Sequence, residues 1–139
     1  MNNAATSWPK PEEVGEAMAK AVRRLPGAAN RGGIEDVNVF DEARRELASL
    51  MGVSCPEQIA LGCNSTWGLN EALFGWPLQE GDTVLATNAE HNSVLRPLYR
   101  LEQSGVRVVY VPADETGRIR PERWKETVQK YRPRLCVLN

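Results

Sequence analysis

The spacing of apolar residues divides the chain into helical and strand-like segments. Apolar side chains recur every three or four residues after Pro11, and again from Phe40 to Met51, which predicts two amphipathic helices. Gly52 follows the second of these, and glycine favours the residue just past a helix end. Further helices are predicted at 64–76, 93–103 and 120–131.

Short apolar runs alternate with the later helices. They predict strands at 59–63, 83–87, 106–111 and 135–138. Strands that alternate with helices favour a parallel sheet joined by right-handed crossovers. The sequence therefore predicts an α/β fold, a mainly parallel sheet with helices on both faces.

Composition narrows the class of protein. The 139 residues can form one domain with a sizeable core, and the net charge of -1 argues against a nucleic-acid surface. No apolar stretch approaches the roughly 18 residues that span a bilayer. The three cysteines form no CxxC pair, so we expect a reducing, cytoplasmic setting, no disulfide framework and no metal site. Cys55, Cys63 and Cys136 are interpreted as packing residues.

Two junctions between a strand and a helix carry candidate chemistry. At the first, Asn64, Ser65 and Thr66 offer capping side chains, free backbone N–H groups and hydroxyls at a helix start. This pattern fits a phosphate cradle, and it also fits ordinary helix capping, which is the commoner role of such residues before a helix. Neither G-x-G-x-x-G nor G-K-[ST] is present, so it is not a dinucleotide fingerprint or a P-loop.

The second junction holds His91, the only histidine of the chain. A histidine in a loop can be merely solvated or structural. Both junctions, however, follow predicted parallel strands, whose carboxyl ends meet at one edge of a sheet. A phosphate cradle and an imidazole at one edge suggest a phosphate-bearing cofactor with a flat ring nearby.

Three segments in this order resemble the class V aminotransferase family, and within it the cysteine desulfurase-like proteins. They are "NNAATSWPKP", "GCNSTWGLN" and "AEHNSVLRPL". The resemblance spans essentially the whole chain. It implies an enzyme of fold type I that uses pyridoxal 5'-phosphate, of which this chain would be the N-terminal part of the large domain.

The resemblance also implies roles for individual residues. Asn64, Ser65 and Thr66 would bind the cofactor phosphate, and His91 would stack on the cofactor ring. Residues near the substrate would be Ala4, Ala5, Thr6 and Arg31, the last from a loop that often crosses a dimer interface. The implied reaction is cysteine desulfuration, from L-cysteine to L-alanine with sulfur transfer to a protein cysteine. A homodimer and a sulfur-acceptor protein would be partners, with no nucleic acid or membrane involved.

The sequence also departs from the family pattern. Trp67 stands where relatives often have Glu or Thr, and Asn2 where they usually have Asp. None of the cysteines matches a nucleophile position. None of the lysines matches the Schiff-base lysine; they are Lys10, Lys20, Lys125 and Lys130.

The chain also stops at the end of a predicted strand. We therefore expect a fragment, inactive alone, with an N-terminal segment, helix and active-site loop at 1–33 and a truncated cofactor-binding domain at 34–139. Two alternatives remain open: an aminotransferase or lyase of the same family, and a non-catalytic α/β module that binds a phosphorylated ligand.

Overall fold

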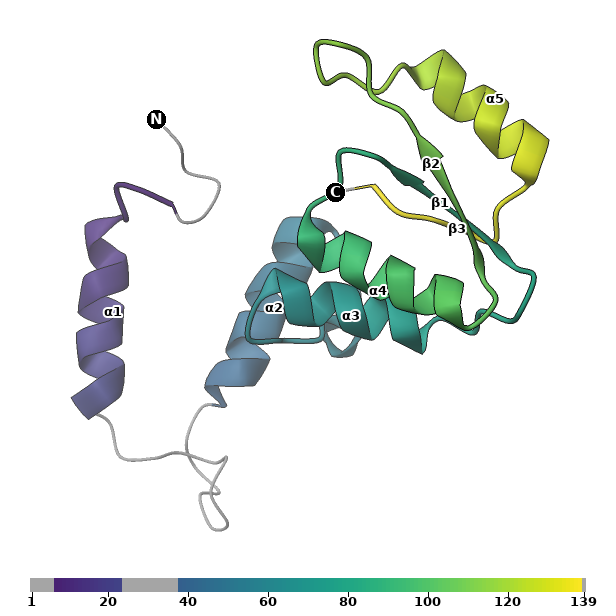
Figure 1. Ribbon diagram of the computed structural model, residues 1–139. Helices are drawn as coiled ribbons and strands as arrows, with labels where there is room; N and C mark the ends of the chain where they lie inside the picture. Colours follow the sequence, from purple (N-terminus) through teal and green to yellow (C-terminus); the bar gives the residue numbers. More distant parts are fainter. Residues whose placement is uncertain (1–6, 24–37, 139) are drawn as a thin grey trace. The chain divides into compact units, whose positions relative to one another are not determined.

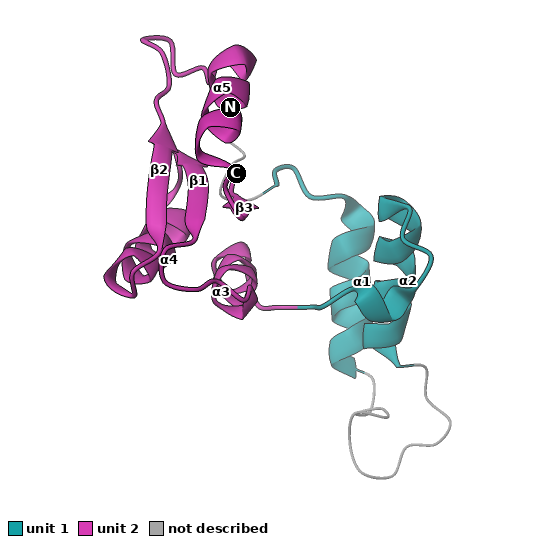
Figure 2. Ribbon diagram, turned by 90° about the vertical axis from the view of Figure 1, so that its right-hand side faces the viewer, with its two compact units in different colours: residues 1–61 teal, residues 62–139 magenta. Residues whose placement is uncertain are grey.

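The computed structural model describes residues 7–23 and 38–138 (Figure 1). They fall into two compact units that divide between Leu61 and Gly62 (Figure 2). The first unit contains α1 (Glu12–Arg23), α2 (Val39–Met51) and a 3-10 helix (Pro56–Gln58). The second contains, in chain order, α3 (Ser65–Gly75), β1 (Thr83–Thr87), α4 (Asn92–Gln103), β2 (Arg107–Val111), α5 (Pro121–Tyr131) and β3 (Leu135–Cys136).

The three strands form a parallel sheet in the order β2-β1-β3. In Figure 1 the sheet lies between α5 on one side and the pair α3 and α4 on the other. This arrangement confirms the predicted α/β class with helices on both faces of a parallel sheet. The predicted strands at 83–87 and 106–111 agree with β1 and β2 to within one residue, whereas β3 covers only two residues of the predicted run.

The core of the second unit lies between β1 and the two helices below it. Alternate residues of a strand point to opposite faces, and Val84 and Ala86 belong to the core cluster on the α4 side. They meet the apolar face of α4, where Val94 and Leu98 are fully buried. Burying one such aliphatic side chain stabilises the fold by about 1.5–3 kcal/mol. Packing thus fixes where α4 begins relative to β1.

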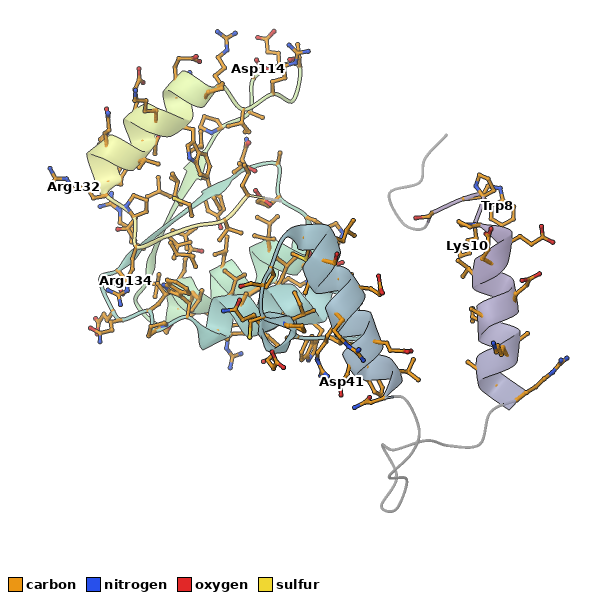
Figure 3. The ribbon with its side chains drawn as sticks, turned by 180° about the vertical axis from the view of Figure 1, so that it is seen from behind. Trp8, Lys10, Asp41, Asp114, Arg132 and Arg134 are labelled. Carbon is orange, nitrogen blue, oxygen red and sulfur yellow. The ribbon has the colours of Figure 1, made fainter. Side chains whose placement is uncertain are left out.

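Polar side chains flank the sheet at both ends, as the positions of Asp114 and Arg134 in Figure 3 show. Asp114 lies in the loop after β2. Arg134 directly precedes β3, and its Nε lies 3.4 Å from Oδ2 of Asp82, just before β1. The backbone N–H of Arg134 also donates to the carbonyl of Thr83 at 2.8 Å, which aligns the starts of β1 and β3.

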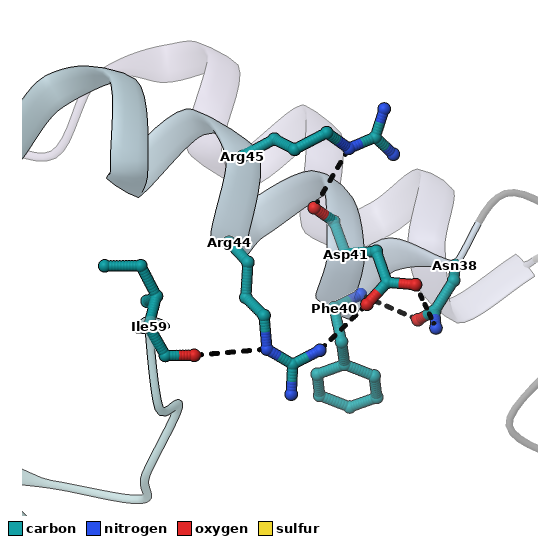
Figure 4. Close-up of polar contacts among 6 residues, drawn as sticks. All are labelled: Asn38, Phe40, Asp41, Arg44, Arg45 and Ile59. Atoms are coloured by element: carbon teal, nitrogen blue, oxygen red, sulfur yellow. Dashed lines mark hydrogen bonds and ion pairs between the residues drawn. The ribbon is translucent and has the colours of Figure 1, made fainter. Parts of the chain in front are cut away.

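The predicted strand at 59–63 is wrong. These residues have no regular secondary structure, and none of the three strands in the described part of the chain pairs with them. The Ile59 carbonyl instead accepts a hydrogen bond of 3.2 Å from Nε of Arg44, a residue of α2 (Figure 4). An apolar run becomes a strand only where a neighbouring strand satisfies its backbone, and these residues have none.

Candidate functional site

The first candidate residues lie at the start of α3. Asn64 is the N-cap, and its side-chain oxygen accepts the N–H of Trp67 at 2.8 Å. Its carbonyl accepts the N–H of Gly68 at 3.1 Å. The N–H groups of Ser65 and Thr66 have no acceptor among the described residues. The helix therefore presents two free donors at the positive end of its dipole, beside two exposed hydroxyls.

Trp67 and Gly62 pack against each other beside this helix start. A Cβ atom added to Gly62 would overlap the six-membered ring of Trp67. Position 62 must therefore be glycine for the indole to lie against the backbone. The indole remains 41% exposed, so it forms an apolar wall next to the free donors. Gly62 is not among the site residues that the sequence predicts.

His91 is the N-cap of α4. Its Nδ1 accepts the backbone N–H of Ser93 at 3.2 Å and lies 2.9 Å from the Ser93 hydroxyl oxygen. A nitrogen that accepts an N–H carries no proton, so the neutral ring in this geometry is protonated on Nε2. The residue as a whole is exposed.

The two helix starts lie at the same edge of the sheet. Helices α3 and α4 pack against each other, and Figure 1 shows both beginning on the side where β1 ends. Ser65, Thr66 and His91 therefore lie at the carboxyl edge of β1. Ligands of open α/β sheets bind at this edge.

Hydrogen bonds tie the turn between β1 and α4 to the end of β2. The Asn88 N–H donates to the carbonyl of Val111 at 3.2 Å. The Asn88 side-chain oxygen accepts the N–H of Ala113 at 2.7 Å. Within the turn, the Thr87 hydroxyl donates to Oε1 of Glu90 at 2.7 Å. None of these supporting residues is predicted from the sequence, because hydroxyl, amide and carboxyl side chains are common in any turn.

Several predicted site residues lie outside the described part of the chain: Ala4, Ala5, Thr6 and Arg31. Asn2 and the predicted loop that carries Arg31 lie there too. Two of the lysines belong to α5, and Lys10 precedes α1, where its Nζ donates to the carbonyl of Ser7 at 2.9 Å (Figure 3).

The interpretation of the cysteines as packing residues is wrong, because Cys55, Cys63 and Cys136 are all exposed. Cys63 belongs to the run that forms no strand, and Cys136 to the two-residue edge strand β3. The hydrogen bond to Glu57, and then the charge of Glu57, raise the pKa of the Cys55 thiol. Partial burial raises the pKa of Cys136. Neither shift favours the reactive thiolate.

The described residues hold no group of three or more His, Cys, Asp or Glu side chains that could bind a metal ion. None of the described helices is both long enough and apolar enough to cross a bilayer.

Comparison with known proteins assigns the family. The family model described as "Aminotransferase class-V" matches residues 1–138. The chain therefore belongs to the class-V aminotransferase family.

Several relatives that the chain matches carry the name cysteine desulfurase. A "Probable cysteine desulfurase" of Methanothermobacter thermautotrophicus is 30% identical over 132 residues, which cover 92% of this chain and 33% of that protein. The cysteine desulfurase IscS of Dictyoglomus turgidum is 29% identical, with 91% of this chain and 33% of that protein covered. This chain thus spans about a third of the length of the curated relatives it matches.

Solved structures share the fold. The apo structure of a cysteine desulfurase from Thermococcus onnurineus superposes with a TM-score of 0.82 at 24% identity and covers 99% of this chain and 35% of that one. The cysteine desulfurase CsdA of Escherichia coli gives a TM-score of 0.69 at 25% identity, covering 93% of this chain and 34% of that one. The described fold is therefore that of a part of a fold type I domain.

Proposed function

We propose that this chain forms part of a pyridoxal-phosphate-dependent enzyme and holds the cofactor at the carboxyl edge of β1. The observation that carries the proposal is the pair of unpartnered N–H groups of Ser65 and Thr66 at a helix N-terminus. A phosphate dianion suits such donors, because the helix dipole and the N–H groups both favour negative charge. The residues present therefore fit the group.

Each candidate residue has a distinct task in this proposal. Ser65 and Thr66 bind the phosphate through their N–H groups, and Thr66 adds its hydroxyl. Asn64 keeps the helix start in place through its bond to Trp67. His91 orients the cofactor ring with its imidazole. Pyridoxal phosphate, when bound, supplies an electron sink for a substrate carbanion.

The proposed reaction is cysteine desulfuration. L-Cysteine and a protein thiol give L-alanine and a protein persulfide, so the sulfur leaves the substrate and joins the acceptor sulfur. The names of the relatives support this choice within the family. Ala4, Ala5, Thr6 and Arg31 are the proposed residues near the substrate. A homodimer, a cytoplasmic location and a sulfur-acceptor protein are part of the same proposal.

The second candidate within the family is an aminotransferase or lyase, favoured by the breadth of the matching family model. The products separate these reactions. Alanine together with sulfide or persulfide indicates desulfuration, a 2-oxo acid indicates transamination, and neither product with phosphate binding retained indicates a non-catalytic module.

Substitution of Thr66 in the full-length protein tests cofactor binding. Loss of a hydrogen bond to a charged group costs about 1.5–3 kcal/mol, so Thr66→Ala should weaken pyridoxal-phosphate binding about 10–100-fold. Absorbance after dialysis and a binding titration measure this loss. The matched control is Thr127→Ala on α5, whose hydroxyl bonds only the carbonyl of Arg123 in the described structure. Equal retention of cofactor by both variants would reduce Thr66 to a helix-capping residue.

A further inference from the structure

Buried polar side chains are concentrated around His91. Among the described residues, the only buried polar or charged ones are Thr87 at 3% exposed, Glu90 at 7% and Ser93 at 8%. All three lie within four positions of the single histidine. We refer to Thr87, Glu90 and Ser93 as the buried polar cluster.

Thr87 and Glu90 brace the backbone of the turn. The Thr87 hydroxyl donates to Oε1 of Glu90 at 2.7 Å and accepts the N–H of Ala89 at 3.3 Å. One hydroxyl therefore links the end of β1, the middle of the turn and the residue just before His91. With Asn88 bonded to the chain after β2, the turn is held at both its sides.

Ser93 acts on the imidazole itself. Its backbone N–H donates to Nδ1 of His91, and its hydroxyl oxygen lies 2.9 Å from the same atom. Two contacts on one ring nitrogen restrict the rotation of the ring. They also keep the proton of the neutral ring on Nε2, at the far side from the helix.

The cluster is costly for the fold. Oε2 of Glu90 is buried and has no hydrogen-bond partner. A buried, unsatisfied carboxylate oxygen destabilises a protein, and an apolar residue at this position would avoid that cost. An arrangement that costs stability and lies beside a candidate site residue is typical of a functional site.

We propose that the buried polar cluster positions His91: Thr87 and Glu90 fix the backbone that carries it, and Ser93 fixes the rotation and tautomer of its ring. That the His91 ring faces pyridoxal phosphate rests on the proposed function. The positioning of His91 by the buried polar cluster does not rest on it. None of the three residues needs to touch the cofactor. They are positioning residues, and their effect passes through His91.

The first test measures the turn without cofactor. In the full-length apo protein, Thr87→Val should raise hydrogen exchange of the 88–94 amides about tenfold, because the brace is lost while the side-chain shape is kept. Thr87→Ser should restore slow exchange, since serine keeps the hydroxyl. Thr127→Val on α5 is the matched control and should leave these amides unchanged. Equal exchange in Thr87→Val and the control would overturn the role of Thr87.

The second test measures the ring. In apo protein labelled with ¹⁵N-histidine, and with the signals assigned through His91→Gln, Ser93→Ala should shift the Nδ1 resonance of His91 and raise the share of the Nδ1-protonated tautomer. This variant removes one small hydroxyl and leaves the backbone N–H of residue 93 in place. Nδ1 and Nε2 resonances identical to those of the wild type would overturn the role of Ser93.

The third test measures function in the full-length protein with pyridoxal phosphate bound. Thr87→Val and Ser93→Ala should move the visible absorbance maximum of bound pyridoxal phosphate and lower kcat about tenfold with little change in KM, because a misplaced group acts mainly on the reacting geometry. An unchanged spectrum and unchanged kcat in both variants would overturn the positioning of His91 for the cofactor. A wild-type protein that retains no pyridoxal phosphate would instead refute the proposed function, and the two apo measurements would still decide the inference.

Discussion

The two units of the chain differ in how far they bury similar apolar side chains. In the second unit, Val94 and Leu98 on α4 are fully buried against the sheet. In the first, Ala48 is the only buried residue among those described, and α1 has none. Leu50 on α2 is 83% exposed although it continues the same helical spacing. An amphipathic pattern therefore identifies the face of a helix that is suited to burial, but not whether the chain itself supplies the partner.

This difference in burial means that the helices of the two units are stabilised by different interactions, by tertiary packing in the second unit and by local helix electrostatics in α1. Helix α4 buries Val94 and Leu98 in the core beside the sheet, so packing dominates its free energy. Helix α1 keeps acidic residues in its first turn and basic ones in its last, which favours the helix dipole, but no described contact buries it. Substitutions that remove packing should therefore change the free energy of unfolding mainly in the second unit. Substitutions that change backbone preference should change it in both units.

The largest expected effect comes from one pair of leucines. Leu98→Ala should lower the free energy of unfolding by about 2–5 kcal/mol, because it leaves a cavity in a closed core. Leu50→Ala should change it by less than about 0.5 kcal/mol in this chain, because the side chain is mostly in water. Urea denaturation of both variants measures the two values.

A large loss of unfolding free energy for Leu50→Ala in this chain would contradict the comparison between the two units. Measuring Leu98→Ala and Leu50→Ala in the full-length protein as well makes the comparison sharper. A cost for Leu50→Ala that appears only there would mean that residues beyond those described cover the exposed face of α2.

The next effect concerns two glycines of the first unit. Gly52 ends α2 with φ of 67°, whereas Gly15 lies inside α1, and a Cβ added to either meets nothing within 4 Å. Gly52→Ala should cost about 1 kcal/mol because an L side chain disfavours the left-handed backbone. Gly15→Ala should stabilise α1 by about 0.5–1 kcal/mol through helix propensity.

Helical circular dichroism and the denaturation midpoint should therefore move in opposite directions for the two glycine variants. Equal signs would show that backbone conformation does not control the stability of this unit.

The sequence predicted the strands that pair with a strand nearby in the sequence. β1 and β2 are joined by one helix, and their β-branched runs and bounds follow from local patterns. The run at 59–63 has similar apolar content, yet it forms no strand because no described strand pairs with it. The predicted packing of Cys63 and Cys136 is wrong for the same reason, since Cys63 lies in the run that forms no strand and Cys136 in the two-residue strand β3.

The sequence predicts the two helix starts of the candidate site, but it does not predict the residues that support them. Asn64 is the N-cap of α3, which capping preferences predict, and His91 is the N-cap of α4, which follows the apolar run of β1. The contact of Gly62 with Trp67 and the bond between Thr87 and Glu90 depend on side-chain packing, which no periodicity encodes. The supporting residues therefore required the structure.

The smallest expected effect lies in the exposed loop after β2 and appears only in acid. The Thr116 hydroxyl donates to Oδ1 of Asp114 at 2.6 Å, and the N–H groups of Thr116 and Arg118 donate to the same oxygen at 2.9 and 3.1 Å. Nε of Arg120 lies 3.5 Å from Oδ2. The Thr116 hydroxyl, followed by the Arg118 N–H, lowers the pKa of Asp114 from 3.8 to about 2.

A carboxylate with a lowered pKa stabilises the folded state above its unfolded pKa, and this stabilisation is lost as the pH falls toward the folded pKa. The thermal midpoint should therefore decline between pH 3.8 and about 2, and Asp114→Asn should flatten part of that decline. Glu115→Gln is the matched control, since Glu115 is exposed and makes no side-chain hydrogen bond in the described structure. Thermal scans across this pH range measure both variants. Parallel pH profiles for Asp114→Asn and the wild type would mean that this loop opens before the second unit unfolds, so that its hydrogen bonds contribute nothing to the packed core.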